Sequence, residues 1–277
     1  MALDPDTGLL KWHYQEIPHD VWDFDSAYEC VLVDLPVKGR MRKLLIHVNK
    51  GGYTFVLDRT NGEFISAWPV AQNINWIRGI DEKGNLIGRL EPNVGEKTVI
   101  CPSIVGGRSW NQAAFSPVTR WFYSTGLEWC QDLTVQKEEP KEGAVFMGAV
   151  FQLRKPPSGE AGSHLDAYDP VSGKKHWTYP SKYPLLASVL STAGDLIFTG
   201  DPEGYFFALD ARTGAKLWSF QTGSGHRGSA IAYAVKGKQY IATPTGWGSA
   251  VAGLLAQLWP EAEKFRAGSA LFVFALP

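Results

Sequence analysis

Three aspartates within six positions form the part of this sequence that is best suited to chemistry. Residues 18–25 read PHDVWDFD, so Asp23 and Asp25 lie on either side of Phe24. In an extended segment, residues two apart point to the same face, and both carboxylates would then look the same way. Like charges that close repel unless a cation lies between them or one of them holds a proton. The pair therefore indicates a metal ion, a general base or both, and the alternative is a solvated acidic turn.

The rest of the chain must supply the elements that position these carboxylates. The chain has 277 residues, of which 44% are hydrophobic and 13% aromatic, so a sizeable core can be buried. Lysine and arginine number 27 against 28 acidic residues, which excludes the basic footprint of a nucleic-acid-binding protein. No apolar run approaches the roughly 18 residues of a membrane span. No signal peptide is visible at the N-terminus.

A repeat accounts for many of the eleven tryptophans. Three copies read ALDPDTGLLKW (2–12), AYDPVSGKKHW (167–177) and ALDARTGAKLW (208–218). A partial copy, VLDRTNGEFIS (56–66), has serine in the tryptophan position. We expect a fifth, degenerate copy in AFSPVTRWFYS (114–124), which lacks both the glycine and the tryptophan.

The repeat predicts pairs of β-strands joined by tight turns. An apolar strand ends at the aspartate, whose side chain caps the turn, and the glycine takes a positive φ. The returning strand then presents the tryptophan. Adjacent copies recur about every 40–55 residues, which is typical of a four-stranded propeller blade. The sequence therefore predicts an all-β propeller with enough residues for about five to six blades, forming a single partial domain over residues 1–277.

In order and spacing, these segments resemble those of the quinoprotein alcohol and methanol dehydrogenases. Those proteins are eight-bladed propellers that use pyrroloquinoline quinone (PQQ) and a metal ion. The resemblance is carried by PHDVWDFD, by CPSIVGGRSWN and GKQYIATPTGWG, and by the tryptophan repeats. It implies that the chain is the C-terminal part of such a propeller, since the first repeat begins in mid-unit. It also implies oxidation of a small primary alcohol to an aldehyde, by hydride transfer to PQQ.

The resemblance answers the question raised by the paired aspartates. It implies that Asp23 is the catalytic base, which takes the hydroxyl proton of the alcohol and also faces the metal. Asp25 occupies the position of an additional carboxylate found in lanthanide-dependent members, where calcium-dependent members have a small residue. Asp23 and Asp25 are therefore expected to be metal ligands, for a lanthanide or for Ca²⁺, because such ions prefer oxygen donors.

Four further residues match cofactor-binding positions of the family. Lys50 lies where many members have an arginine that contacts the quinone oxygens. Ser109 replaces an asparagine that hydrogen-bonds PQQ, so this contact is expected to pass through water or to Asn111. Trp247 matches a segment near the cofactor. Residues 185–188, LLAS, depart from the usual Trp-Asn-Gly-Gly run, which puts the shape of the substrate pocket in question.

The three cysteines carry further implications. Cys101 and Cys130 match a family disulfide, and a disulfide is typical of the periplasm, where the family works. Cys30 is left over and is expected to pack as a small apolar residue. The sequence has no C-x-x-C-H haem motif, so electrons are expected to leave to a separate c-type cytochrome. A homodimer is compatible with the resemblance.

Two other functions compete with the dehydrogenase. A non-catalytic propeller scaffold would share the tryptophan repeats, but it would not need Asp23, Asp25 and Lys50 together. A hydrolase could use the two aspartates as an acid and base, but they are too close together to flank a glycosidic bond. The family's remaining metal ligands and much of its PQQ pocket precede the matched segments. We therefore expect that the chain lacks these N-terminal blades and is inactive when isolated.

Overall fold

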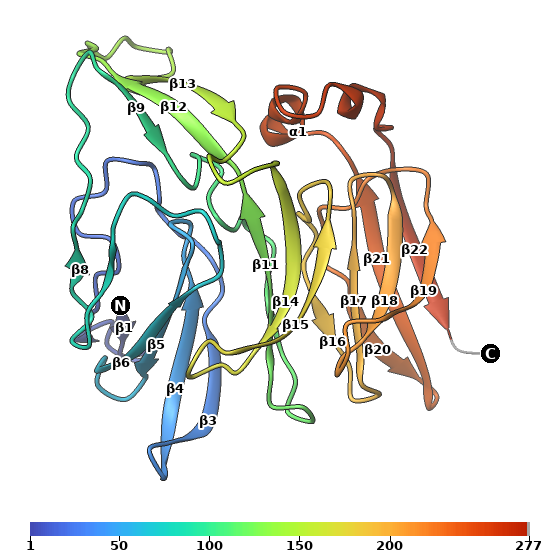
Figure 1. Cartoon of the computed structure of the whole chain (residues 1–277). Helices are drawn as coiled ribbons and strands as arrows, with labels where there is room; N and C mark the ends of the chain where they lie inside the picture. Colours follow the sequence, from blue (N-terminus) through green and yellow to red (C-terminus); the bar gives the residue numbers. More distant parts are fainter. Residues whose placement is uncertain (276–277) are drawn as a thin grey trace.

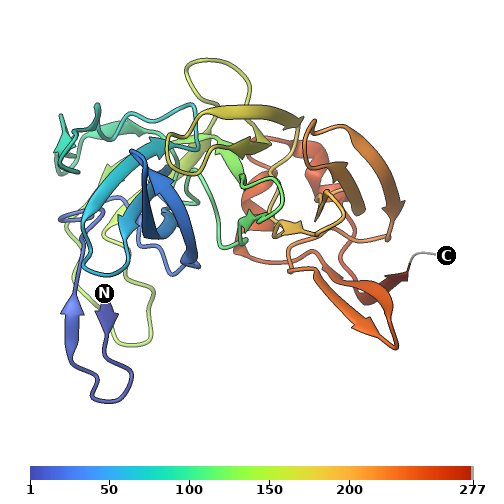
Figure 2. The same ribbon diagram turned by 90° about the horizontal axis from the view of Figure 1, so that it is seen from below.

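The computed structural model describes residues 1–275 and is built almost entirely of β-strands (Figure 1). Antiparallel sheets follow one another along an arc, and the two ends of the chain lie at opposite ends of that arc (Figure 2). Two short helices, α1 (Ala250–Leu255) and the 3-10 helix η1 (Pro260–Lys264), separate the last two strands. None of the helices in this part of the chain is long and apolar enough to cross a bilayer.

Three sheets have the four antiparallel strands that a propeller blade requires. The first comprises β3 (Val31–Val37), β4 (Arg40–Val48), β5 (Tyr53–Asp58) and β6 (Phe64–Pro69). The second comprises β10 (Ala114–Phe115), β11 (Phe122–Glu128), β14 (Gly162–Tyr168) and β15 (Lys175–Ser181). The third comprises β16 (Leu190–Ser191), β17 (Leu196–Gly200), β18 (Tyr205–Asp210) and β19 (Lys216–Gln221). The expected all-β fold of four-stranded blades is thereby confirmed.

Smaller sheets complete the described residues. One three-stranded sheet comprises β9 (Lys97–Ile100), β12 (Cys130–Val135) and β13 (Ala149–Arg154). Another comprises β20 (Ile231–Val235), β21 (Lys238–Gly246) and β22 (Ser269–Ala275). Two-stranded pairs are formed by β1 (Ala2–Leu3) with β2 (Leu10–Trp12) and by β7 (Gly79–Ile80) with β8 (Leu86–Ile87).

The repeated tryptophans join each repeat to the next. Three indole N–H groups each donate to a backbone carbonyl in the next turn, three residues before the glycine of that turn. The pairs are Trp12 with Arg59 (3.1 Å), Trp68 with Pro170 (3.3 Å) and Trp177 with Ala211 (2.9 Å). A Cβ on these turn glycines, Gly62, Gly173 or Gly214, would lie 2.3–2.7 Å from the docked indole. Glycine is therefore required at these turns both for its positive φ and for the close approach of the ring.

In the partial repeat, the docking tryptophan lies two residues later in the sequence than in the full copies. Ser66 occupies the expected position, and its hydroxyl donates to the Val171 carbonyl at 2.6 Å. Trp68 lies two residues further along β6, on the same face of the strand, and docks on the next turn instead. There it packs against Phe122 and Tyr168, at ring-centroid distances of 6.1 and 4.5 Å, within the apolar layer between the first two four-stranded sheets.

The expected fifth copy at residues 114–124 is not a copy of the docking turn. It forms the turn between β10 and β11, the first two strands of a blade, whereas the docking turns inside the four-stranded blades join the third and fourth strands. The resemblance arises because Ser116 caps this turn as aspartate does elsewhere, accepting a hydrogen bond from the Thr119 N–H. Arg120 adopts a φ of 62° where the true copies have glycine.

Candidate active site

The aspartates of the PHDVWDFD segment lie in an irregular loop and not in an extended strand. Asp23 has a φ of 62°, which lies in the left-handed region that few non-glycine residues adopt. The carboxylate of Asp20 stabilises this backbone conformation, accepting hydrogen bonds from the N–H groups of Trp22 (2.9 Å) and Phe24 (2.6 Å). Asp20 is a residue whose role we missed, although it is the first of the three clustered aspartates.

Phe24 separates the two candidate carboxylates by pointing into the core. Its ring is buried and meets the ring of Trp76 edge-on at 5.5 Å, whereas the flanking side chains of Asp23 and Asp25 are 55% and 80% exposed. The Trp76 indole also donates to the Gly51 carbonyl at 2.9 Å. Trp76 therefore supports the aspartate loop and the neighbouring loop that carries Lys50 at the same time.

Lys50 brings the predicted charges together. Its ammonium Nζ lies 3.1 Å from Asp23 Oδ2 and 3.9 Å from Asp25 Oδ1, and its side chain is only 11% exposed. The Lys50 backbone N–H donates to the hydroxyl of Ser26 at 2.8 Å, which ties the two loops together. In this structure, a lysine is therefore the cation that reduces the repulsion between the two carboxylates.

The surroundings of Asp23 shift its pKa upward. Partial burial raises the pKa of Asp23, and the neighbouring Asp25 carboxylate raises it further, while Lys50 opposes both effects. A raised pKa gives a carboxylate greater affinity for a proton than an ordinary aspartate has.

A cavity of 170 Å³ opens beside Asp23 and Lys50. Its polar lining also includes Ser109 and Tyr28. Its apolar lining comes from Ile104, Val105, Trp110, Phe151 on β13, and Val251 and Leu254 on α1. Figure 1 shows the three-stranded sheet of β9, β12 and β13 and the helix α1 at the same end of the molecule. The cavity therefore offers a charged group, hydrogen-bonding groups and an apolar wall to one small ligand.

Two of the predicted cofactor residues do not line this cavity. Asn111 is buried, and its amide donates to the Thr125 hydroxyl at 2.7 Å and to the Ala187 carbonyl at 3.2 Å. The segment 185–188 thus packs against Asn111. Trp247 is buried in an apolar cluster, with its ring 6.1 Å from that of Phe265.

A buried ion pair that the sequence did not reveal positions Tyr28. Arg108 is fully buried, and its Nη2 lies 2.7 and 2.8 Å from the two carboxylate oxygens of Glu29. The Arg108 guanidinium lies 5.2 Å from the centre of the Tyr28 ring, and the Tyr28 hydroxyl donates to the Arg108 carbonyl at 3.1 Å. Since Arg108 precedes Ser109, this pair fixes one wall of the cavity against the aspartate loop.

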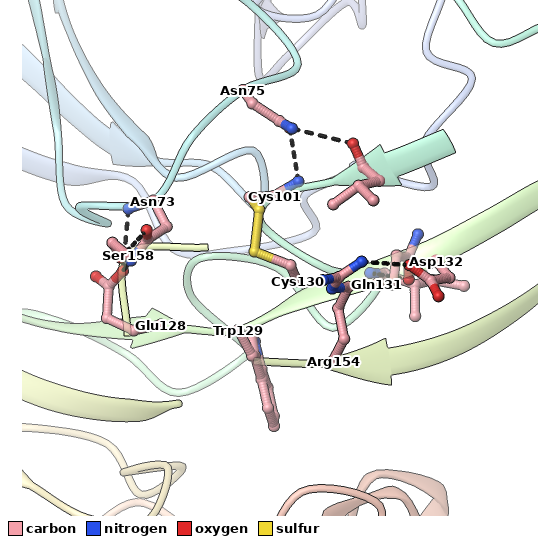
Figure 3. Close-up of a disulfide and its surroundings, with 12 residues drawn as sticks. Asn73, Asn75, Cys101, Glu128, Trp129, Cys130, Gln131, Asp132, Arg154 and Ser158 are labelled. Carbon is pink, nitrogen blue, oxygen red and sulfur yellow. Dashed lines mark hydrogen bonds and ion pairs between the residues drawn. A yellow bond between two sulfur atoms is a disulfide. The ribbon is translucent and has the colours of Figure 1, made fainter. Parts of the chain in front are cut away.

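The expected disulfide between Cys101 and Cys130 is present (Figure 3). It lies beside Trp129, whose buried indole donates to the Gly106 carbonyl at 2.9 Å. The loop that follows Cys101 carries cavity residues Ile104 and Val105, so the disulfide anchors that wall.

Cys30 is exposed, so our expectation that it packs as a small apolar residue is wrong. It lies at the end of the irregular segment, immediately before β3, and not inside a packed strand.

The two aspartates are not part of a larger metal-ligand cluster. Residues 1–275 contain no group of three or more His, Cys, Asp or Glu side chains arranged to hold a metal ion. Asp23 and Asp25 can therefore contribute only part of the shell of a hard cation, which takes about six to eight oxygen ligands.

The fold and the site define a β-propeller with a cavity that is lined in part by charged side chains, at one end of its blades. The PQQ family model, described as glucose/ethanol/alcohol dehydrogenase, beta-propeller domain, matches residues 1–74 and 180–241. The chain belongs to this quinoprotein dehydrogenase family.

Similar proteins extend the match across the whole chain. Quinoprotein alcohol dehydrogenase PedH of Pseudomonas putida is 38% identical over 285 residues, covering 100% of this chain and 48% of the relative. The lanthanide-dependent methanol dehydrogenase of Methylorubrum extorquens is 35% identical, covering 89% of this chain and 43% of the relative. The structure of a europium-containing methanol dehydrogenase superposes with a TM-score of 0.91 at 32% identity, covering 99% of this chain and 52% of that one. The chain thus spans about half the length of the curated relatives it matches.

Proposed function

We propose that this chain carries the proton-accepting part of a PQQ-dependent alcohol dehydrogenase site, in which Asp23 takes the hydroxyl proton of a primary alcohol. The observation that carries the proposal is the convergence of Asp23 and Asp25 on Lys50 beside a cavity with an apolar wall. A non-catalytic scaffold would not require this arrangement. The family relationship supports the same reaction class.

The carboxylate oxygens of the two aspartates suit a hard metal ion, which prefers oxygen donors. Asp23 and Asp25 would each supply one oxygen ligand to that ion. Lys50 and Ser109 would face bound PQQ. When bound, PQQ supplies a two-electron acceptor for hydride and the metal supplies Lewis acidity. A trivalent lanthanide gains more than Ca²⁺ from the second carboxylate, so Asp25 favours the lanthanide.

The chain's own residues would orient the alcohol and hold its proton. An oxygen of the Asp23 carboxylate would accept the hydroxyl proton, since this carboxylate lines the cavity and is 55% exposed. The Lys50 ammonium would keep Asp23 beside Asp25 by balancing their charges. The apolar lining from Ile104 and Phe151 would contact the hydrocarbon part of the alcohol and exclude water.

The electron acceptor and the compartment follow from the same proposal. A c-type cytochrome is the proposed electron acceptor, and a relative that is 32% identical over 286 residues, the 1-butanol dehydrogenase (cytochrome c) of Thauera butanivorans, supports it. The Cys101–Cys130 disulfide favours an oxidising compartment, and we place the protein in the periplasm.

Substitution of the two aspartates tests the proposal. Because the chain spans half of its relatives, turnover is measured in a chimera in which this chain replaces the matching residues of the Pseudomonas putida relative. Alcohol-dependent dye reduction is followed with lanthanum and with calcium. Asp23→Asn should lower turnover by about 100-fold or more with both metals while PQQ remains bound, since the amide keeps the shape and loses the base. Asp25→Ala should lower lanthanum-supported turnover far more than calcium-supported turnover.

The control is Asp34→Asn, which changes a half-exposed carboxylate paired with Arg59 on the first four-stranded sheet. It should leave both activities unchanged. The chain by itself should give no dye reduction, because the carboxylates it contributes do not complete a metal shell. Unchanged turnover in Asp23→Asn would refute the assigned base. Equal losses with both metals in Asp25→Ala would refute the metal preference.

A further inference from the structure

Arg227 is a half-buried cation for which residues 1–275 provide no anionic partner. It lies in the loop between β19 and β20, and its guanidinium donates to the hydroxyl of Ser249. Burial lowers the pKa of Arg227, and within residues 1–275 no carboxylate pairs with it to offset that burial. Removing a charge from water without a compensating opposite charge is unfavourable. An external anion would therefore be stabilised at this position.

Other shielded arginines of the chain have such partners. The fully buried Arg108 is paired with Glu29, at 2.7 Å. Arg42, which is less exposed than its partner Glu63, contacts both Glu63 and Asp58. Arg227 thus differs from arginines whose charge serves only to hold the fold together.

Arg227 lies beside Trp110, a residue that lines the cavity of the candidate active site. Its guanidinium lies 5.8 Å from the centre of the Trp110 ring, and Trp110 lines the cavity that contains Asp23 and Lys50. Trp110 is 58% exposed, so a planar group of a ligand has access to its indole. Neutral hydrogen-bonding groups lie nearby, since Ser229, two residues beyond Arg227, donates to the Gln112 side chain at 2.6 Å.

We propose that Arg227 and Trp110 form a carboxylate-binding subsite at the rim of this cavity. A guanidinium recognises a carboxylate with two parallel N–H groups, and an exposed indole beside it supports a flat ligand. Two ligands would bring a carboxylate to this place: PQQ, which is a tricarboxylate, or a small hydroxycarboxylate substrate. The inference rests on the proposed function only in treating the neighbouring cavity as the ligand site.

Equilibrium binding tests the subsite without any turnover, in the chimera with the Pseudomonas putida relative, prepared without PQQ. PQQ and, separately, glycolate are titrated into this parent chimera, with ethylene glycol as the neutral analogue of glycolate, and heat and tryptophan fluorescence are recorded. Arg227→Gln should weaken binding of the carboxylate ligand about tenfold, because a charge-assisted hydrogen bond is lost. Arg227→Lys keeps the positive charge but loses the two parallel N–H donors of the guanidinium, so binding should weaken less than in Arg227→Gln. Arg212→Gln removes a surface arginine paired with Asp195 and should bind as the parent does.

The two probes identify the source of the carboxylate. If PQQ binding alone weakens in Arg227→Gln, the subsite receives the cofactor. If glycolate binds to the parent and is lost in this variant while ethylene glycol is unaffected, the subsite selects hydroxycarboxylate substrates. Binding of both probes unchanged in Arg227→Gln would overturn the proposal, as would failure of the parent to bind either one. Because no catalysis is measured, failure of the Asp23 mechanism would leave this result intact.

Discussion

His164 holds a buried positive charge between two carboxylates, and raising the pH should remove that charge and destabilise the fold. Its Nε2 lies 3.0 Å from Glu128 and its Nδ1 lies 2.8 Å from Asp166. Lys175 also pairs with Asp166, at 2.7 Å, so two cations and two anions balance within this cluster. Burial alone would lower the pKa of His164, but the hydrogen bonds to Asp166 and Glu128 raise it to about 9.

The effect on stability follows from this raised pKa. The folded value of about 9 exceeds the ordinary value of 6.5, so the stabilisation is complete below pH 6.5 and is lost as the pH rises through 9. Converted with about 1.4 kcal/mol per pKa unit, the loss in the free energy of unfolding between pH 7 and pH 10 is about 2–3 kcal/mol. That is a large fraction of the stability of a typical domain, about 5–15 kcal/mol.

The same cluster is connected to the candidate active site. Glu128 accepts hydrogen bonds from the N–H groups of Gln72 (2.7 Å) and Asn73 (3.0 Å), and Figure 3 shows Glu128 beside Asn73. This loop leads to Trp76, which supports Phe24 between Asp23 and Asp25. Loss of the charge on His164 should therefore loosen the aspartate loop as well as lower the global stability.

Urea unfolding followed by tryptophan fluorescence at pH 7, 8, 9 and 10 measures the effect. The parent should lose about 2–3 kcal/mol more of its free energy of unfolding over this range than His164→Gln, which has no titrating group at the position. His176→Gln, which changes an exposed histidine, should retain the alkaline loss of the parent. Equal losses in the parent and His164→Gln would refute the reasoning. A parent curve that stays flat from pH 7 to pH 10 would do so even if the variant does not fold.

Two further predictions concern the propeller itself. Gly173→Ala should destabilise the fold by about 1–3 kcal/mol more than Gly8→Ala. Both glycines have φ near 70°, but only at Gly173 would the added Cβ collide with an indole, that of Trp68. Equal urea midpoints for the two variants would contradict the docking role. Replacing Cys101 and Cys130 by serine should cost about 3 kcal/mol, since their bond closes a loop with a sequence separation of 29, and an unchanged melting temperature would show that the loop is already ordered without it.

The propeller blades were predictable because their signals are local. An aspartate cap, a glycine with positive φ and a tryptophan on the returning strand lie within eleven residues, and each acts on its immediate neighbours. The misread segment at 114–124 shows the limit of such signals. Ser116 and Arg120 reproduce the local shape of the turn, but which two strands of a blade a turn joins depends on sheet pairing that no short motif encodes.

The candidate site was predicted in part. The sequence identified Asp23, Asp25 and Lys50 through their resemblance to family motifs, and the structure brings the three together. The orientations of Asn111 and Trp247 were not predictable, because whether a side chain faces a cavity or the core depends on the neighbours that pack against it.

By itself, the sequence determined the all-β class, the tryptophan-docked turns and the charged residues that the site contains. Only the tertiary structure decided how those residues meet. Asp20 stabilises the loop at Asp23, Trp76 supports that loop and the loop of Lys50 together, and Arg227 is left beside Trp110 without an acidic partner among the described residues. The reason is physical: capping and turn formation are governed by residues a few positions apart, whereas ion pairing and desolvation depend on groups brought together from distant parts of the chain.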